Sequence, residues 1–136
     1  MISVIFGRKG SGKTKRIIDM ANAATANNKG DLVFIDDDNR YMFELHRNIR
    51  FINAGEYDIS NPVGLLGFIS GICASNYDLE TLFLDGFLRI VKAPLEEMRD
   101  FFALLDALGT RMSVNFIISI SGDPQAIPDF IAPFVI

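Results

Sequence analysis

A short glycine-rich stretch near the N-terminus constrains the fold of this chain more than any other feature. Its residues are Gly7, Arg8, Lys9, Gly10, Ser11, Gly12, Lys13 and Thr14. The stretch fits the pattern G-x-x-x-x-G-K-[ST] at all four fixed positions, and this pattern is typical of a loop that binds phosphate groups. In such a loop the backbone N–H groups point inward, and the helix that follows presents its free N–H groups and the positive end of its dipole to the phosphates.

The residues on either side of the loop favour this interpretation. Residues 2–6 predict a short apolar strand that runs into the loop. Residues 13–28 predict a helix that leaves it, with Gly30 as the residue that ends the helix. The simpler alternative is a glycine-rich turn that only caps a helix, but a cap needs neither the additional glycines nor the Lys13-Thr14 pair.

The loop carries the side chains expected to meet a nucleotide. Lys13 is expected to reach the β- and γ-phosphates, and the hydroxyl of Thr14 is expected to ligate Mg²⁺. Lys15 adds positive charge at the start of the helix. We therefore expect residues 7–15 to bind ATP, or another nucleoside triphosphate, together with Mg²⁺.

A second motif lies further along the chain, where an apolar strand ends in an aspartate. Residues 81–85 read Thr-Leu-Phe-Leu-Asp, which fits the Walker B pattern. In that pattern the carboxylate holds Mg²⁺ through water, opposite the hydroxyl of the phosphate-binding loop, here residues 7–14 and called the P-loop below. The pattern is weak alone and informative downstream of a phosphate-binding loop, so Asp85 is predicted to be the metal-side carboxylate. Gly86 follows, where many ATP-hydrolysing enzymes place a glutamate that activates water, so slow hydrolysis is expected. Arg89 and Arg111 are candidate arginine fingers, in this chain or toward a neighbouring subunit.

Three consecutive carboxylates, Asp36, Asp37 and Asp38, follow an apolar run at residues 32–35. Ligands bind at the carboxyl edge of open parallel sheets, so one of these carboxylates is a candidate to face the substrate or the metal. The alternative is that Asp38 or Asn39 caps a short helix over residues 40–47 and that the other carboxylates are solvated.

Two serines end another apolar run, at residues 113–121. Ser119 and Ser121 lie at the edge where the γ-phosphate is expected. Ser121 either senses that phosphate or closes the last hydrogen bonds of its strand, and the sequence favours neither alternative.

The rest of the chain continues the alternation of strands and helices. The further expected elements are a strand at 50–54, a helix at 62–75 capped by Asn61, a helix after Pro94 closed by Gly109, a short helix after Asp123 and an edge strand at 134–136. This order predicts an α/β fold of three layers, with a mostly parallel central sheet of about five strands, in a single domain of residues 1–136. Gly64, Gly67 and Gly71 share one face of helix 62–75, which favours close packing on the sheet or on another subunit over a ligand-facing role.

Composition excludes several classes of function. The net charge of −4 argues against a large basic face, so no nucleic-acid partner is expected. Cys73 and His46 are the single residues of their types, so neither an internal disulfide nor a zinc site of these residues can form. Cys73 is expected to be buried, and His46 to lie at the surface or in packing rather than in catalysis. Neither a signal peptide nor a membrane span is expected, and a cytoplasmic location fits.

The P-loop, the alternating strands and helices, and Asp85 at the end of a later strand together resemble the P-loop NTPase superfamily. Within it the chain resembles the RecA-like, additional-strand branch, because a strand precedes Asp85 after the P-loop. It is also similar to short bacterial chains labelled as twitching-motility (PilT-type) ATPases. The motility motors themselves carry histidine-rich motifs, whereas this chain has one histidine. A weaker resemblance, through Asp38-Asn39-Arg40-Tyr41, is to thymidine kinases, whose cysteine-rich zinc lasso one cysteine cannot supply.

These features predict a small cytoplasmic ATP-binding protein with slow, Mg²⁺-dependent hydrolysis. One alternative is a small-molecule kinase in which Asp36 or Asp37 binds or deprotonates an acceptor hydroxyl. The other is a nucleotide-dependent switch or assembly subunit with little turnover, as part of a homo-oligomer or with a protein partner. The missing glutamate after Asp85 favours both alternatives over a fast ATPase.

Overall fold

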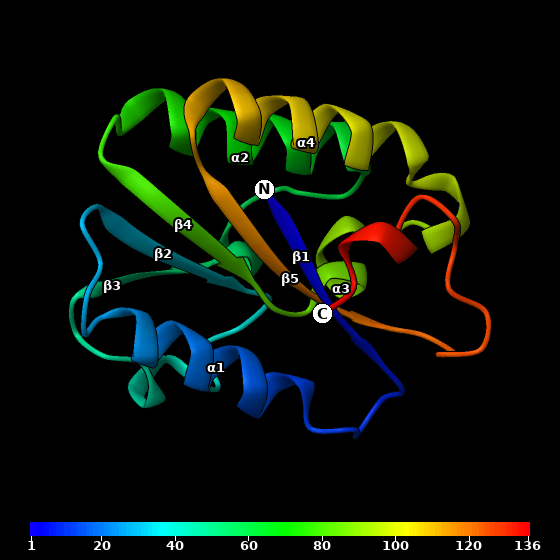
Figure 1. Ribbon diagram of the computed structural model, residues 1–136, viewed down its shortest axis with the longest axis horizontal. Coiled ribbons are helices and arrows are strands. Elements are labelled where there is room, and N and C mark those ends of the chain that lie inside the picture. The colour runs from blue at the N-terminus through cyan, green and yellow to red at the C-terminus, as the bar shows by residue number, and fades with distance from the viewer.

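The computed structural model describes all 136 residues and alternates strands with helices (Figure 1). The strands are β1 (Ile2–Gly7), β2 (Asp31–Asp36), β3 (Ile49–Asn53), β4 (Leu79–Leu84) and β5 (Asn115–Ser121). The α-helices are α1 (Lys13–Ala24), α2 (Pro62–Ser75), α3 (Phe87–Val91) and α4 (Arg99–Met112). Short 3₁₀ turns lie at Met42–Glu44, Ala54–Glu56, Leu95–Glu97 and Ala132–Phe134.

The five strands form one sheet in the order β1-β5-β4-β2-β3, and every neighbouring pair is parallel. The α/β fold with a parallel sheet of five strands is therefore confirmed. Because all strands run the same way, the P-loop after β1, the end of β4 and the end of β2 meet at one edge of the sheet. Strand β5 lies between the strand that enters the P-loop and the strand that ends at Asp85.

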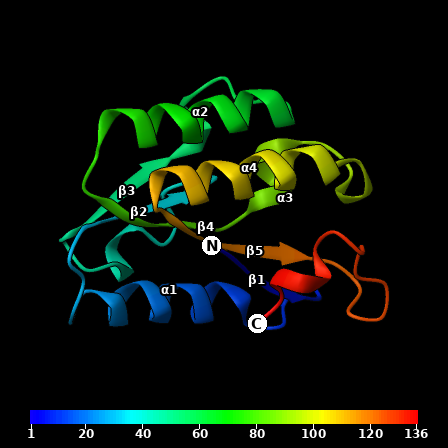
Figure 2. The same cartoon turned by 45° about the horizontal axis from the view of Figure 1, so that its top comes forward.

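Helices cover both faces of the sheet, which makes the three expected layers (Figure 2). α1 packs on one face, and α2, α3 and α4 pack on the other. The alternation of side chains along β4 follows these layers, since Phe83 joins the core under α1 whereas Leu82 and Leu84 join the larger core under the other helices. No helix combines the length and the apolar character that crossing a membrane requires.

Helix α1 ends earlier than the sequence predicts. Its last residue is Ala24, and residues 25–27 form tighter turns in which each backbone N–H donates to the carbonyl three residues back. The hydroxyl of Thr25 also donates to the carbonyl of Asn22, at 2.6 Å. Gly30 therefore does not end this helix. It lies instead beside β4, where its N–H donates to the side chain of Glu80 at 3.0 Å.

Helix α4 ends later than predicted, because Gly109 does not close it. The helix continues to Met112 and is followed by Ser113 in a left-handed conformation. Gly109 is buried, and a Cβ atom there would lie 2.9 Å from the carbonyl oxygen of Val114 and 3.0 Å from the ring of Phe116. This glycine permits close contact between α4 and β5 rather than a helix end.

Helix α2 has the predicted bounds, and Asn61 caps it by accepting the N–H of Gly64 at 2.7 Å. The expected packing of its glycine face on the sheet is wrong. Gly64, Gly67 and Gly71 are exposed, and Leu65, Ile69 and Cys73 make the buried face instead. Packing of the glycine face on another subunit stays a prediction.

Three short elements differ from the expectation. The helix expected at 40–47 is a single 3₁₀ turn, residues after Asp123 form a turn, and the expected edge strand is an isolated bridge between Val4 and Val135. The sequence also missed α3. Burial of Cys73 and the surface position of His46 are confirmed.

Candidate functional site

The P-loop leaves β1 and turns back before α1, and two of its glycines make that turn. Gly10 and Gly12 have φ angles of 80° and 89°, in the left-handed region that other residues rarely adopt. The N–H of Ser11 donates to the carbonyl of Arg8 at 3.1 Å. The N–H of Gly122 donates to the carbonyl of Gly7 at 2.9 Å, which ties the start of the loop to the end of β5.

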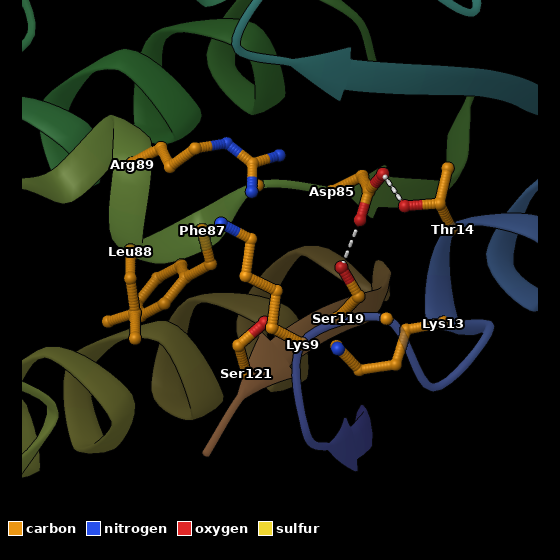
Figure 3. Close-up of a pocket in the computed structure, with 11 residues that line it drawn as sticks. Lys9, Lys13, Thr14, Asp85, Phe87, Leu88, Arg89, Ser119 and Ser121 are labelled. Carbon is orange, nitrogen blue, oxygen red and sulfur yellow. Dashed lines mark hydrogen bonds between the residues drawn. The ribbon is translucent and has the colours of Figure 1, made fainter.

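The end of β4 brings Asp85 against the start of α1 (Figure 3). Thr14 Oγ1 donates to Asp85 Oδ2 at 2.9 Å, and the hydroxyl of Ser119 donates to Asp85 Oδ1. The backbone N–H of Asp85 donates to the carbonyl of Ile35, at 2.9 Å. Asp85 is only 3% exposed, and both hydrogen-bond donors to its carboxylate are neutral hydroxyls. This buried negative charge is held in place without a direct ion pair.

The position of Ser119 follows from strand register. Leu84 pairs with Ile118, so the next residue of each strand, Asp85 and Ser119, lie side by side. Ser121 is two residues further along β5 and therefore points to the same face. The two serines at the end of β5 thus have separate places: Ser119 holds Asp85, and Ser121 lines the cavity beside it.

A cavity of about 300 Å³ opens between the P-loop and the start of α3. Its lining residues are Lys9, Gly10, Lys13, Thr14, Asp85, Gly86, Phe87, Leu88, Arg89, Ser119 and Ser121. Three cations and one carboxylate therefore face this space, which favours an anionic ligand. Lys13 Nζ donates to the carbonyl of Arg8 at 2.8 Å. Burial lowers the pKa of Lys13, the charge of Asp85 opposes this, and the charge of Arg89 lowers it further.

The donors at the inner end of this cavity fit a magnesium ion. Thr14 Oγ1 and the carboxylate of Asp85 are hard oxygen ligands, which Mg²⁺ prefers to nitrogen or sulfur. Asp85 is also a buried charge without a cation in direct contact, so an ion beside it would compensate a charge that the fold leaves unpaired. Thr14 and Asp85 are the residues that would hold this ion.

The predicted site residues do not all face one cavity. Lys9, Gly10, Lys13, Thr14, Asp85 and Ser121 line the cavity described above. Gly7, Arg8, Ser11 and Gly12 line a second cavity, of about 370 Å³, which Lys13 also borders. Arg8 also pairs with Asp123, at 3.1 Å. Lys15 lines neither cavity and pairs with Asp19, at 2.9 Å.

The three carboxylates after β2 have different surroundings. Asp38 Oδ1 accepts the backbone N–H of Arg40 at 2.8 Å, so it caps a turn rather than the helix expected there. Asp37 accepts a two-pronged ion pair from Arg89, with 2.8 Å between Nε and Oδ2 and 3.1 Å between Nη2 and Oδ1. Burial raises the pKa of Asp37, but the hydrogen bond from Arg89 contributes to a net pKa below the ordinary value.

Asp36 is the most deeply buried of the three, at 1% exposure. Its Oδ1 accepts the N–H of Asp37 at 2.7 Å, and its Oδ2 has no hydrogen-bond partner. Burial, followed by hydrogen bonding with Asp37 and the charge of Asp85, raises the pKa of Asp36 to about 8. Asp36 is therefore a much weaker acid than an ordinary aspartate.

Sequence reasoning missed the cavity wall formed by Phe87 and Leu88, because it did not predict α3. The signal was present, since Gly86 precedes a run with apolar residues at helical spacing. Of the two candidate arginines, Arg89 borders the cavity. Arg111 lies at the end of α4, just before β5 begins, and therefore at the opposite edge of the sheet.

Of the comparisons with known proteins, the one with solved structures finds a match, and that match concerns the fold alone. No family model matches the chain, and a search of the curated proteins finds no relative. Among solved structures, the chain is similar to the flagellar accessory protein FlaH from Methanocaldococcus jannaschii, with a TM-score of 0.61 and 12% identity. The match covers 97% of this chain and 65% of that chain. It supports the α/β fold with a parallel sheet, and the resemblance to the RecA-like branch and to PilT-type chains stays a prediction.

Proposed function

We propose that this chain binds ATP, or another nucleoside triphosphate, with Mg²⁺ and hydrolyses it slowly. The observation that carries the proposal is the 2.9 Å hydrogen bond between Thr14 and Asp85, which lie 71 residues apart in the chain. The fold brings the last residue of a phosphate-binding pattern to a buried carboxylate, beside a cavity that Lys9, Lys13 and Arg89 make positive. This is the combination of groups that a magnesium triphosphate needs.

Each group has a separate task in this proposal. The N–H groups of the P-loop and of the first turn of α1 bind phosphate oxygens, and Lys13 compensates the charge that develops on the terminal phosphate. Thr14 and Asp85 would hold the metal, which would supply positive charge to the phosphates. Ser119 holds the carboxylate of Asp85 in one orientation. Phe87 and Leu88 exclude water from one side of the cavity.

Calorimetric titration of the purified chain with ATP and with GTP, each with and without Mg²⁺, tests the proposal directly. We expect saturable binding of at least one triphosphate, tighter with Mg²⁺ than without it. No heat of binding for either nucleotide, in a chain that is folded by circular dichroism, would contradict the proposal.

Asp85→Asn is expected to remove most of the gain in triphosphate affinity that Mg²⁺ gives, a loss of about fivefold or more, since the carboxylate acts on the ion. Binding of the nucleotide without metal should change much less. Calorimetry with Mg²⁺ and with a chelator separates these effects. Asp78→Asn, an exposed residue just before β4, is the matched control and should match the parent chain. Equal losses with and without metal, or no loss, would make Asp85 a structural residue.

Hydrolysis by the isolated chain is expected to be slow, well below about 1 s⁻¹. Gly86 cannot orient water, and the raised pKa of the buried Asp36 reduces the fraction of its carboxylate form, which is the form that could accept a proton. Phosphate release from the purified chain with ATP and Mg²⁺ measures the rate, and Lys13→Ala supplies the background. Rapid release by the parent chain would contradict this prediction, and Asp36→Asn would then be the first variant to test for loss of rate.

A second candidate function is phosphate transfer to a small acceptor. A further cavity, of about 170 Å³, is lined by Asp37, Ala54, Gly55, Tyr57, Ile59, Arg89, Ile90 and Lys92. It shares Arg89 with the nucleotide cavity, so an acceptor bound there would lie next to the terminal phosphate. Chromatography of reaction products with nucleosides and small hydroxyl compounds as acceptors tests this candidate. A chain that binds nucleotide and forms neither phosphate nor a phosphorylated product fits the switch or assembly role instead.

A further inference from the structure

Arg89 lies in the first turn of α3, four residues after Asp85. Its side chain borders the nucleotide cavity, and Figure 3 shows the guanidinium extending from α3 in the direction of Asp85. The guanidinium makes both of its hydrogen bonds to one carboxylate, that of Asp37. The hydrogen bonds and charge of that carboxylate raise the pKa of Arg89 against the effect of burial. A charged guanidinium with two parallel N–H donors therefore stands at the edge of the cavity.

The surroundings of this ion pair leave Arg89 free to change partners. Its side chain is 60% exposed, whereas that of Asp37 is 24% exposed. Arg89 also borders the smaller cavity beyond the pair, so open space lies on two sides of it. Because the guanidinium end of this pair is open to solvent, water and salt screen its attraction to Asp37. The carboxylate of Asp37 therefore holds the guanidinium in position without locking it there.

A terminal phosphate is a strong competitor for the same guanidinium. Phosphate presents paired oxygens to a guanidinium in the same two-pronged geometry as a carboxylate, and it carries more charge. Arg89 and Lys13 line the same cavity, so the two cations repel each other across it. An anion bound between them would relieve that repulsion. A diphosphate, which ends one phosphate group earlier, offers less charge for this exchange.

We propose that Arg89 distinguishes a nucleoside triphosphate from a diphosphate, by exchanging its ion pair with Asp37 for the terminal phosphate. This inference rests on the proposed function and adds a specificity-determining residue to it. Release of Asp37 is the local consequence. Since Asp37 follows β2 directly and borders the smaller cavity, the exchange changes the charge of that cavity when the triphosphate binds.

The alternative is a structural ion pair that only fastens the residues after β2 to α3. The two possibilities predict different changes in nucleotide affinity for the variants Arg89→Gln and Asp37→Asn. If the pair is only structural, replacing either partner removes the same stabilisation. Arg89→Gln and Asp37→Asn should then have the same effect on the affinity for both nucleotides. In the exchange that we propose, Arg89→Gln removes the phosphate contact, whereas Asp37→Asn removes the competitor and frees Arg89 for the phosphate.

The experiment measures binding of a non-hydrolysable ATP analogue and of ADP, each with Mg²⁺, by calorimetry. Arg89→Gln should weaken binding of the analogue about tenfold and change binding of ADP less than about twofold. Asp37→Asn should tighten binding of the analogue, by about threefold, and leave ADP unchanged. Arg111→Gln, at the opposite edge of the sheet, is the matched control and should match the parent chain for both nucleotides.

The outcomes separate this inference from the proposed function. If the parent chain binds neither nucleotide, both fail. If the parent binds both and Arg89→Gln weakens both equally or neither, Arg89 does not read the terminal phosphate, and the proposed function stands. Circular dichroism and thermal unfolding check that each variant is folded. Should Arg89→Gln unfold, Arg89→Lys takes its place: selective weakening of the analogue supports the inference, and an equal effect on both nucleotides overturns it.

Discussion

We expect Lys13→Ala to weaken the binding of ATP with Mg²⁺ by at least about tenfold, or about 1.4 kcal/mol. Lys13 belongs to the P-loop and lines the cavity. Its amino group donates to the carbonyl of Arg8, which holds the side chain against the loop that is proposed to receive the phosphates. Burial lowers the pKa of this lysine, which shows that its charge is partly withdrawn from water. A phosphate that meets such a group gains more than it would from a fully solvated cation.

Calorimetric titration measures this effect, and Lys29→Ala is the matched control. Lys29 is exposed and precedes β2, so it lies at the edge of the sheet opposite the P-loop. The control variant should bind as the parent chain does. Thermal unfolding should differ little among the three chains, because Lys13 contributes one hydrogen bond and no apolar packing to the fold. Equal affinity in Lys13→Ala and the parent chain would contradict the assignment of the loop.

The phosphate-binding half of the proposed site can be named from the sequence because that half is local. The loop, its glycines and Thr14 lie within eight consecutive residues. Gly12, a fixed position of the pattern, takes the left-handed conformation, and so does Gly10, which stands at a variable position. The partnership of Thr14 with Asp85 follows once the sheet is known to be parallel, since both then lie at its carboxyl edge.

The other half of the site depends on tertiary contacts that a linear pattern does not contain. Arg89 could be named as a candidate, but its pairing with Asp37 requires the end of β2 to lie beside the start of α3, across the edge of the sheet. The burial of Asp36 likewise depends on the helices that cover β2. The errors at Gly30 and Gly109 have the same origin, because each glycine was interpreted from its neighbours in sequence and is placed by a contact with another element.

Asp36→Asn is expected to change how stability depends on pH more than any other single substitution of a carboxylate. Burial, hydrogen bonding with Asp37 and the charge of Asp85 raise the pKa of Asp36 from 3.8 to about 8 in the folded chain. Between these values the unfolded chain loses a proton that the folded chain keeps, so the folded state is penalised as the pH rises. The free energy of unfolding should therefore fall, by up to about 1.4 kcal/mol per pH unit, from about pH 4 to about pH 8.

Chemical denaturation at pH 5, 6, 7 and 8 measures this dependence in the parent chain and in Asp36→Asn. The amide does not titrate, so the variant should lose most of the slope and become more stable than the parent chain as the pH rises. Asp37, whose pKa is lowered, affects the free energy of unfolding in the opposite sense, because its contribution is lost as the pH falls. This loss occurs below about pH 4, outside the measured range. Asp19→Asn, which removes an exposed partner of Lys15 on α1, should keep the slope of the parent chain. A parent chain whose stability does not change over this range would show that Asp36 is ionised when folded, and the buried carboxylate would then be available to accept a proton at neutral pH.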